Sequence, residues 1–399
     1  MDLFEQELRK KTIFKDRNVL SPHYVPNHLP HREKEINRIM KVLAPALSQK
    51  RPSNLFIYGG TGTGKTATTK HVLRKLMEVR EKYGATVDSV YLNCRTYNTK
   101  YQVMLKLAQI ASPNENLLGY AFSHLYEKFL NYVDSRGVIF ITALDEIDKI
   151  KDLDELLYSL TRANDVLETG HVCIIGISNK VTFKQKLDPR SKSTLCQEEM
   201  IFPPYNAEQL RAILLERCKE GFKEGTYMES AVALAAALAA RESGDARYAL
   251  RLVLKAGEIA DETNGKVTEE CVKKARIAVE EDVVVELINA LPQHQAIVLY
   301  GIALLSGQEG KYKRLAEEPP GKDRVLFSGE VYEEYKDLCR NWSVQPRSAR
   351  WFREYINELE MMGLITTMIS GKGVRGNTRL IKIAFPKEKI KSALEKKFG

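Results

Sequence analysis

The sequence lacks any apolar stretch long enough to cross a membrane. A spanning helix needs roughly 20 apolar residues in succession, and the longest candidate, residues 231–240, is short and rich in alanine. The first residues, MDLFEQELRKK, also lack the basic-then-apolar order of a signal peptide. We therefore expect a cytoplasmic location and no membrane partner.

Cysteine is scarce and scattered. The six cysteines form no C-x-x-C pair, and they lie at positions 94, 173, 196, 218, 271 and 339. This spacing fits reduced thiols in the core better than disulfides or metal ligands.

What the chain does contain is material for more than one hydrophobic core. Its 399 residues exceed the usual single-domain limit, so two or three domains are expected. The net charge is +9, and residues 311–399 hold 19 Lys and Arg against 12 Asp and Glu. A basic C-terminal module indicates either a polyanionic partner or a solubilising surface, and charge alone does not separate the two.

Residues 53–66, SNLFIYGGTGTGKT, fit the phosphate-binding pattern G-x-x-x-x-G-K-[ST]. An apolar strand, residues 55–58, precedes the loop, and helically spaced apolar residues follow over 65–83. Free N–H groups at a helix start bind phosphate, and glycine lets the backbone approach it closely. We expect Lys65 on the β- and γ-phosphates and Thr66 as a Mg²⁺ ligand. The candidate contacts to ATP or ADP are Gly59, Gly60, Thr61, Gly62, Thr63, Gly64, Lys65, Thr66 and Ala67.

An extended segment and an amphipathic helix precede this loop. Pro26 and Pro30 keep residues 24–29 extended, and apolar residues at helical spacing follow over 36–47. The segment either covers an adenine ring or serves only in packing. The candidate adenine contacts are Val25, His31 and Arg32. His23, His28 and His31 lack a cysteine neighbour that would complete a zinc pattern, so they suit solvated or nucleotide-neighbouring positions better.

Two carboxylates end a second buried strand. Residues 138–150, VIFITALDEIDKI, place Asp145 and Glu146 at its carboxyl end. Burying such a pair without a cation costs several kcal/mol. We therefore expect Asp145 to hold Mg²⁺ and Glu146 to orient or deprotonate the attacking water. A further apolar strand ends in Asn179, which is expected to reach the γ-phosphate or that water.

Two arginines each allow two interpretations, one at a nucleotide site and one on the surface. Arg190, on a proline-initiated turn in LDPRSKS, either touches the γ-phosphate of a neighbouring subunit or is an exposed, salt-bridging side chain. Arg247, in the first turn of a helix, either points at the nucleotide or is a solvated helix charge. Pro203-Pro204 marks a boundary, and Tyr205 directly after it is a further candidate nucleotide contact.

The C-terminal quarter has the order of a winged helix. Helices are expected at 283–306, restarted by Pro292, at 331–342 and from near Pro346 to Gly363, with a loop over 308–329. The third helix should bury Ala349, Phe352, Ile356 and Leu359, and two strand-like runs joined by GKGVRGN follow it. Such a unit reads the DNA major groove with its third helix, although winged helices also serve protein contacts. The candidate DNA contacts are Arg347, Arg350, Trp351, Lys372, Arg375 and Arg379.

In this order, the motifs LPHREKEI, SNLFIYGGTGTGKT, LDEID, ISN, LDPRSKS, GDARYAL and VYEEYKDLC resemble the archaeal origin-recognition initiators. These are AAA+ ATPases related to the eukaryotic origin-recognition and cell-division-cycle loading proteins. The resemblance implies a Walker A motif at the glycine-rich loop and a Walker B motif at Asp145 and Glu146. It also implies sensor one at Asn179, an arginine finger at Arg190 and sensor two at Arg247. Helices within residues 96–136 would include an initiator-specific insertion that touches DNA.

We therefore expect an α/β fold: a flexible basic lead-in (1–18), an AAA+ P-loop core with a parallel sheet (19–205), a helical lid (206–281) and a winged-helix domain (282–399). The expected protein is a nucleoid-associated, slow, switch-like ATPase that binds ATP, ADP and Mg²⁺. Its expected partners are double-stranded origin DNA, the replicative helicase and paralogous initiator subunits. The wing, GKGVRGNTR, departs from the compact GRGR-type tip of the family, which affects the origin sequence that is read.

Two other functions stay open at this point. The first is a clamp-loader-like assembly ATPase, where a Ser-Arg-Cys finger is expected and this chain has Asp188-Pro189-Arg190. The second is a DNA-binding transcription regulator that keeps a nucleotide site without turnover.

Overall fold

The computed structural model describes residues 12–185, 187–263, 265–306, 325–369, 379–385 and 387–398. The chain divides into two compact units, Met1–Ala275 and Arg276–Gly399. They are called the first and the second unit below, and each is described by itself.

A five-stranded parallel sheet organises the first unit, in the order β2-β3-β4-β1-β5. Parallel strands are joined by crossover helices, so all carboxyl ends meet at one edge, where ligands bind in open α/β sheets. The predicted α/β fold with a parallel sheet is confirmed. The strands are β1 Leu55–Gly59, β2 Val87–Asn93, β3 Ile139–Asp145, β4 His171–Ser178 and β5 Glu198–Phe202.

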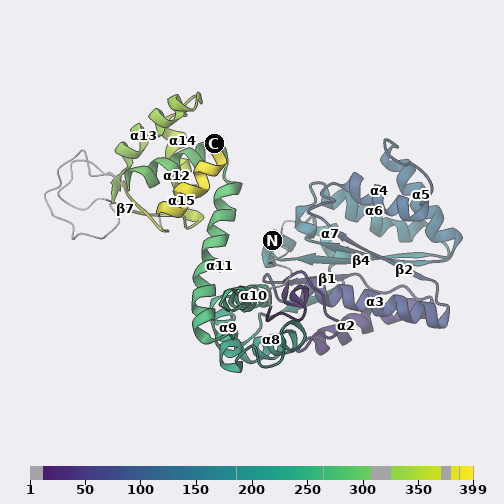
Figure 1. Ribbon diagram of the computed structural model, residues 1–399. Coiled ribbons are helices and arrows are strands. Elements are labelled where there is room, and N and C mark those ends of the chain that lie inside the picture. Colours follow the sequence, from purple (N-terminus) through teal and green to yellow (C-terminus); the bar gives the residue numbers. More distant parts are fainter. Residues whose placement is uncertain are drawn as a thin grey trace. The chain divides into compact units, whose positions relative to one another are not determined.

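Helices cover both faces of this sheet (Figure 1). Strand side chains alternate between the faces: Leu55 and Ile57 pack with α2 and α3, whereas Phe56 and Tyr58 pack on the opposite side. Each face thus has its own apolar core. The first face carries α2 Glu33–Leu43 and α3 Lys65–Tyr83, and the second carries α4 Lys100–Ala111, α5 Phe122–Ser135, α6 Leu153–Val166 and α7 Pro189–Leu195. Short 3₁₀ helices lie at Arg17–Leu20, Ala44–Ser48, Ile147–Lys149 and Val181–Gln185.

A helical region follows the sheet, with α8 Ala207–Gly221, α9 Glu229–Glu242, α10 Ala246–Glu262 and α11 Glu269–Ala290. Asn206 caps α8, because its side chain accepts from the backbone N–H of Gln209 in a capping box. The expected helix start at Val283 is wrong. Helix α11 instead runs through this position, because residues 276–290 contain neither glycine nor proline to break it.

The second unit forms a winged helix, as predicted. Helix α12, Gln293–Leu305, starts after Pro292 and is followed by α13 Ser328–Asn341 and α14 Ala349–Met361. An antiparallel sheet in the order β6-β8-β7 completes it, with β6 Leu326–Phe327, β7 Ile365–Ile369 and β8 Arg379–Ile383. The sequence interpretation did not include β6 or the terminal helix α15, Lys387–Phe398. It also placed Ala349 in the buried face of α14, but Ala349 is exposed because it is the first residue of the helix.

All six cysteines are free. Cys94, Cys173, Cys218 and Cys339 are buried, while Cys196 and Cys271 are half-buried. Among the residues that the structure describes, no helix has both the length and the apolar character that a membrane crossing requires.

Candidate functional site

A cavity of about 560 Å³ lies in the first unit, at the carboxyl edge of the sheet. Four parts of the chain line it: residues 22–30, here called the strap; the glycine-rich loop at 62–67; the ends of β2, β3 and β4; and helices α8 and α10. Of the predicted nucleotide contacts and catalytic residues, the cavity brings together Val25, Gly62, Thr63, Gly64, Lys65, Thr66, Ala67, Asp145, Glu146, Asn179, Tyr205 and Arg247.

The loop between β1 and α3 depends on glycine. Gly62 and Gly64 have φ angles of +62° and +90°, which L side chains rarely adopt. The Nζ of Lys65 donates to the carbonyl oxygens of Gly59 at 3.0 Å and Gly60 at 2.6 Å. Burial lowers the pKa of Lys65 to about 8, and the negative charge of Asp145 partly opposes this shift. The loop thus wraps a buried amine and precedes a helix N-terminus, the arrangement that suits a phosphate.

Asp145 collects hydrogen bonds at the end of β3. Its Oδ2 accepts from the hydroxyls of Thr66 and Tyr91, each at 2.6 Å, and its Oδ1 accepts from the backbone N–H of Glu146 at 2.9 Å. Burial and the hydrogen bond to Asp145 raise the pKa of Tyr91. A carboxylate oxygen and a hydroxyl side by side are hard ligands of the kind that Mg²⁺ prefers. The donor set therefore fits a magnesium ion held by Asp145 and Thr66.

Glu146 follows with a left-handed backbone, at φ +54°. Its carboxylate is ion-paired with Arg95, and only 17% of its side chain is exposed. Asn179 lies on the same side of the cavity, directly after β4. A carboxylate and an amide therefore sit next to the phosphate loop, where a water molecule is oriented in phosphoryl transfer.

Helix α10 rests directly on the glycine-rich loop. The backbone N–H of Ala246 donates to the carbonyl oxygen of Gly62 at 3.1 Å, and Asp245 caps the helix by accepting from the N–H of Arg247 at 2.6 Å. Arg247 is exposed and lines the cavity. Its charge therefore faces the space in front of the loop.

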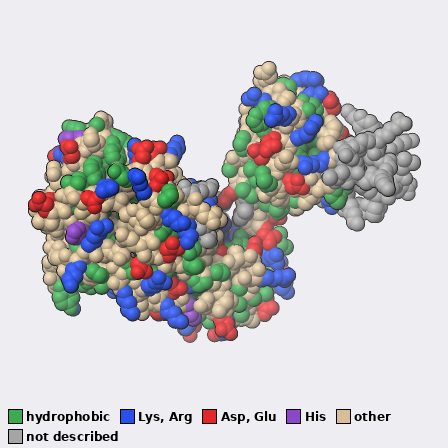
Figure 2. Space-filling model, turned by 180° about the vertical axis from the view of Figure 1, so that it is seen from behind, with side chains coloured by type: hydrophobic (Ala, Val, Ile, Leu, Met, Phe, Trp, Pro, Cys, Tyr) green, Lys and Arg blue, Asp and Glu red, His purple; other side chains and the backbone are tan. Residues whose placement is uncertain are grey.

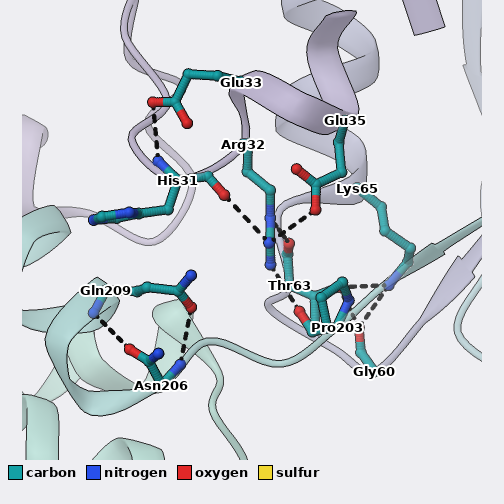
Figure 3. Close-up of polar contacts among 10 residues, drawn as sticks. All are labelled: His31, Arg32, Glu33, Glu35, Gly60, Thr63, Lys65, Pro203, Asn206 and Gln209. Atoms are coloured by element: carbon teal, nitrogen blue, oxygen red, sulfur yellow. Dashed lines mark hydrogen bonds and ion pairs between the residues drawn. The ribbon is translucent and has the colours of Figure 1, made fainter. Parts of the chain in front are cut away.

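Six predicted site residues lie elsewhere than the cavity wall: Gly59, Gly60, Thr61, His31, Arg32 and Arg190. His31 is exposed, and the neighbouring His23 and His28 line the cavity in its place. Arg32 was a candidate adenine contact, with packing as the alternative; only 1% of it is exposed, and its side chain points to Thr63 and Pro203 (Figure 3). This difference arises because the Arg32 side chain turns inward to backbone carbonyls.

Arg190 lies on the surface, in the first turn of the short helix α7 and not on a simple turn. Asp188 caps this helix by accepting from the backbone N–H of Arg190 at 2.8 Å. The Arg190 guanidinium makes no ion pair with any residue in the described part of the chain. The alternative of an intramolecular salt bridge thus has no partner there.

Sequence reasoning missed several residues that line the cavity, among them Tyr91, Arg95 and Arg217. Tyr91 and Arg95 flank the end of β2, which pairs in register with the end of β3 through Asn93 and Asp145. The rule that ligands bind at the ends of parallel strands could have found them. Arg217 carried no such signal, because it donates to the carbonyls of Val19 at 3.1 Å and Tyr24 at 3.0 Å across a long sequence separation.

The candidate DNA contacts belong to the second unit. Helix α14 buries Phe352, Ile356 and Leu359, and it leaves Arg350 and Trp351 exposed. Arg347, in the exposed turn before α14, places its Nε 3.4 Å from Nε2 of His294. Arg379 starts β8 and donates to Oδ1 of Asn357 on α14 at 2.5 Å. Lys372 and Arg375 lie outside the described residues.

Basic and acidic side chains are interspersed on the face of each unit seen in Figure 2. Charge therefore does not mark a binding surface on the face in view, and the exposed residues at the start of α14 are the more specific feature.

Comparison with known families assigns all three parts of the chain. Residues 28–175 match the AAA ATPase domain, residues 211–277 the Cdc6 AAA+ ATPase-type lid domain, and residues 286–393 the CDC6 C-terminal winged helix domain. Over 400 residues, the chain is 41% identical to the ORC1-type DNA replication protein 1 of Archaeoglobus fulgidus, covering 100% of this chain and 94% of that protein.

The chain belongs to the ORC1-type family of DNA replication proteins. It is also 42% identical to the ORC1-type protein of Thermococcus onnurineus, over 98% of this chain and 92% of that one. Among solved structures it is similar to the ORC1 protein of Aeropyrum pernix in complex with DNA. That match has a TM-score of 0.80 and 38% identity, and it covers 97% of this chain and 98% of the other.

The family predicted from the motifs is thus confirmed. An ORC1-type protein with an AAA ATPase domain is a replication initiator that binds nucleotide and has ATPase activity in general.

Proposed function

We propose that this ORC1-type protein binds origin DNA in an ATP-dependent manner and helps to recruit the replicative helicase, with ATP binding and hydrolysis as a slow switch. The observation that carries this proposal is a single chain with both a nucleotide-sized cavity lined in part by helices α8 and α10 and a winged helix with an exposed basic start to α14. The first can sense nucleotide, and the second can hold DNA.

In the cavity, each residue has a proposed role. The loop N–H groups and the Lys65 ammonium bind the phosphates of ATP or ADP, and Val25 and Tyr205 bound the cavity near the strap and α8. Thr66 and Asp145 would hold Mg²⁺, which neutralises phosphate charge when bound. Glu146 accepts a proton from the attacking water, Asn179 orients that water, and Arg247 stabilises the γ-phosphate from the lid.

DNA binding is proposed for two surfaces. The ORC1 protein of Aeropyrum pernix, 38% identical to this chain, was solved in complex with DNA, which supports α14 with Arg347, Arg350 and Trp351 as the major-groove element. The loop between α4 and α5 supplies a second candidate. There Leu118 and Tyr120 are 68% and 46% exposed, as expected of side chains that pack against a partner such as DNA.

Arg190 is proposed to act on a neighbouring subunit. It is exposed at the start of α7, outside the wall of its own cavity. An arginine placed in this way can reach a γ-phosphate bound by another initiator on the same DNA.

Binding to duplex DNA at several salt concentrations tests the DNA half of the proposal. We expect tighter binding to an origin duplex than to a random duplex of equal length, with affinity for both falling as salt rises. Equal affinities at every salt concentration would contradict origin recognition and leave the ATPase proposal intact. Arg350→Ala should weaken binding, whereas Arg241→Ala, an exposed arginine on α9 of the first unit, serves as the matched control.

The switch half is tested with Glu146→Gln. The variant should bind ATP and Mg²⁺, but its rate of ATP hydrolysis should fall by at least about 100-fold, because it lacks the proposed base. DNA complexes formed with ATP should then persist longer than those of the unchanged protein. A variant that releases DNA at the normal rate would contradict the coupling of hydrolysis to DNA binding.

A further inference from the structure

Arg32 is the most completely buried charged side chain near the cavity, at 1% exposure. A guanidinium removed from water costs several kcal/mol unless its donors are satisfied. The Nε of Arg32 donates to the carbonyl oxygen of Thr63 at 2.9 Å, and Nη2 donates to the carbonyl oxygen of Pro203 at 2.8 Å. Nη1 lies 3.4 Å from the carbonyl oxygen of His31 and 3.3 Å from Oε1 of Glu35 (Figure 3). The charge is therefore fixed by its partners.

These partners come from separate parts of the chain. Thr63 belongs to the glycine-rich loop, and its hydroxyl donates to the carbonyl of Gly60, which also accepts from Lys65. Pro203 begins the connector, residues 203–206, which joins β5 to α8. A guanidinium presents its donors in a rigid planar fork, so it can hold both backbones in a fixed geometry while its face lies against a ring; a lysine ammonium lacks this planar geometry.

Tyr205 extends the contact toward the lid helices. The guanidinium carbon of Arg32 lies 3.8 Å from the centroid of the Tyr205 ring, a favourable cation–π position. The backbone N–H of Tyr205 donates to the carbonyl oxygen of Gly244 at 3.1 Å. Gly244 directly precedes Asp245, the N-cap of the helix that carries Arg247.

The contacts close into a ring. Ala246, next along the chain, donates its N–H to the carbonyl oxygen of Gly62, one residue before Thr63. A side chain at Gly64 would collide with Tyr205, because its Cβ would lie 2.7 Å from the Tyr205 hydroxyl. The loop, the connector and the start of α10 are thus held in one arrangement with Arg32 at its centre.

We propose that Arg32 is a positioning residue that sets Arg247 relative to the phosphate loop. It does not touch the nucleotide. It fixes Thr63 on one side and the connector on the other, so that a change at the phosphates reaches α10 and a movement of α10 reaches the loop. This inference rests on the proposed nucleotide site and adds how that site is linked to the lid.

The test is a double-mutant cycle on nucleotide affinity in the full chain. Arg32→Met and Arg247→Ala are measured singly and together with fluorescent ADP and ATP analogues. If Arg32 positions Arg247, removing Arg247 should matter at least about fivefold less when Arg32 is already absent, since residues in one network do not act additively. Additive effects would overturn the proposal and leave Arg32 with a purely structural role.

Arg38→Met is the matched control. Arg38 lies on α2, the helix that begins directly after Arg32, and it donates to a carbonyl of β5, that of Glu199 at 2.8 Å, but half of its side chain is exposed. Arg38→Met should leave both the nucleotide affinity and the effect of Arg247→Ala on that affinity unchanged. Arg32→Lys keeps the charge without the fork, so it should behave like Arg32→Met; full recovery of the Arg247 effect by lysine would overturn the proposal.

Three further outcomes distinguish the role of Arg32 from the nucleotide site itself. If Arg32→Met does not fold, Tyr205→Leu removes the ring and leaves the guanidinium, and it should reduce the Arg247 effect in the same way; an unchanged effect would overturn the proposal. If the unchanged protein binds neither analogue, the proposed nucleotide site fails. If it binds both and the cycle is additive, only the role of Arg32 fails.

Discussion

The hydroxyl of Tyr91 donates a 2.6 Å hydrogen bond to Oδ2 of Asp145 on the neighbouring strand. The same oxygen accepts from Thr66 at 2.6 Å, so the proposed magnesium ligand is oriented from two sides. Partners of this kind set the direction of a metal ligand and tune its affinity.

Tyr91→Phe should therefore weaken magnesium-dependent nucleotide binding by about tenfold. The ring and its packing remain, and only the hydroxyl that orients Asp145 is lost. Titration of nucleotide with and without Mg²⁺ checks this, since binding without the metal should change little. Tyr83→Phe, at a ring that is 71% exposed at the end of α3, is the control. An equal loss with and without Mg²⁺ would contradict the role assigned to Tyr91.

Arg190→Ala should leave a single chain almost untouched. The guanidinium is exposed and has no ion-pair partner among the described residues, so the free energy of unfolding should stay within about 0.5 kcal/mol. ATP turnover should fall only where subunits assemble on DNA if, as proposed, the arginine acts on a neighbour. Turnover measured across protein and DNA concentrations distinguishes this from Arg247→Ala, which should weaken nucleotide binding by the isolated chain. A loss of turnover that is independent of assembly would contradict action on a neighbour.

His294 should make the second unit sensitive to acid. Burial, together with the positive charge of Arg347, lowers the pKa of His294 from its usual 6.5. Its ring lies between Tyr335, whose hydroxyl is 2.9 Å from Nδ1, Arg347 and the stacked ring of Tyr355. A neutral Nε2 accepts from Arg347, whereas a protonated one cannot.

The folded state therefore binds this proton less readily than the unfolded state. The stability contribution is present above the unfolded pKa and is lost as pH falls below about 6.5 toward the lower folded pKa. Urea unfolding of the full chain from about pH 5 to 7 should show this decline, and His294→Gln should flatten it. His124→Gln, at an exposed ring in the first unit, is the control. An unchanged slope in His294→Gln would contradict the assignment.

Lys397 closes the C-terminal end of α11. Its Nζ donates to the carbonyl oxygens of Ile288 at 3.1 Å, Asn289 at 2.8 Å and Leu291 at 2.6 Å. Lys397→Met removes three charged hydrogen bonds, although the carbonyl of Ile288 still accepts from the backbone N–H of Leu291, so the second unit should lose about 1–3 kcal/mol of unfolding free energy. The exposed Lys396→Met is its neighbour and should change little. Equal changes in thermal stability for the two variants would contradict a stabilising role for the Lys397 hydrogen bonds.

Local patterns predicted the elements around the phosphate loop. The apolar run of β1 and the helical spacing of α3 are short-range signals, and the glycines that join them permit the positive φ angles of the loop. The same signals failed where an element depends on distant partners. Strand β6 is two residues long and exists because it pairs with β8, more than fifty residues later.

The candidate site divides in the same way. Motif spacing predicted site roles for Asp145 and Asn179 and the family resemblance one for Arg247, and all three line one cavity. It could not place Arg32, whose side chain direction is decided by carbonyls at Thr63 and Pro203, 31 and 171 residues away. A charged residue beside a binding motif is read from sequence as a ligand contact, but backbone carbonyls are equally strong partners once they are buried.

Gly62 is constrained from two directions. Besides its φ of +62°, a Cβ at this position would lie 1.6 Å from Oδ1 of Asp245, the N-cap of α10. Replacing Gly62 with alanine would thus create a steric clash that separates the loop from the start of α10. A glycine expected to serve phosphate binding is therefore also required for the contact between the loop and α10. Substitution at this position would thus be disfavoured even in a relative that had lost ATP turnover.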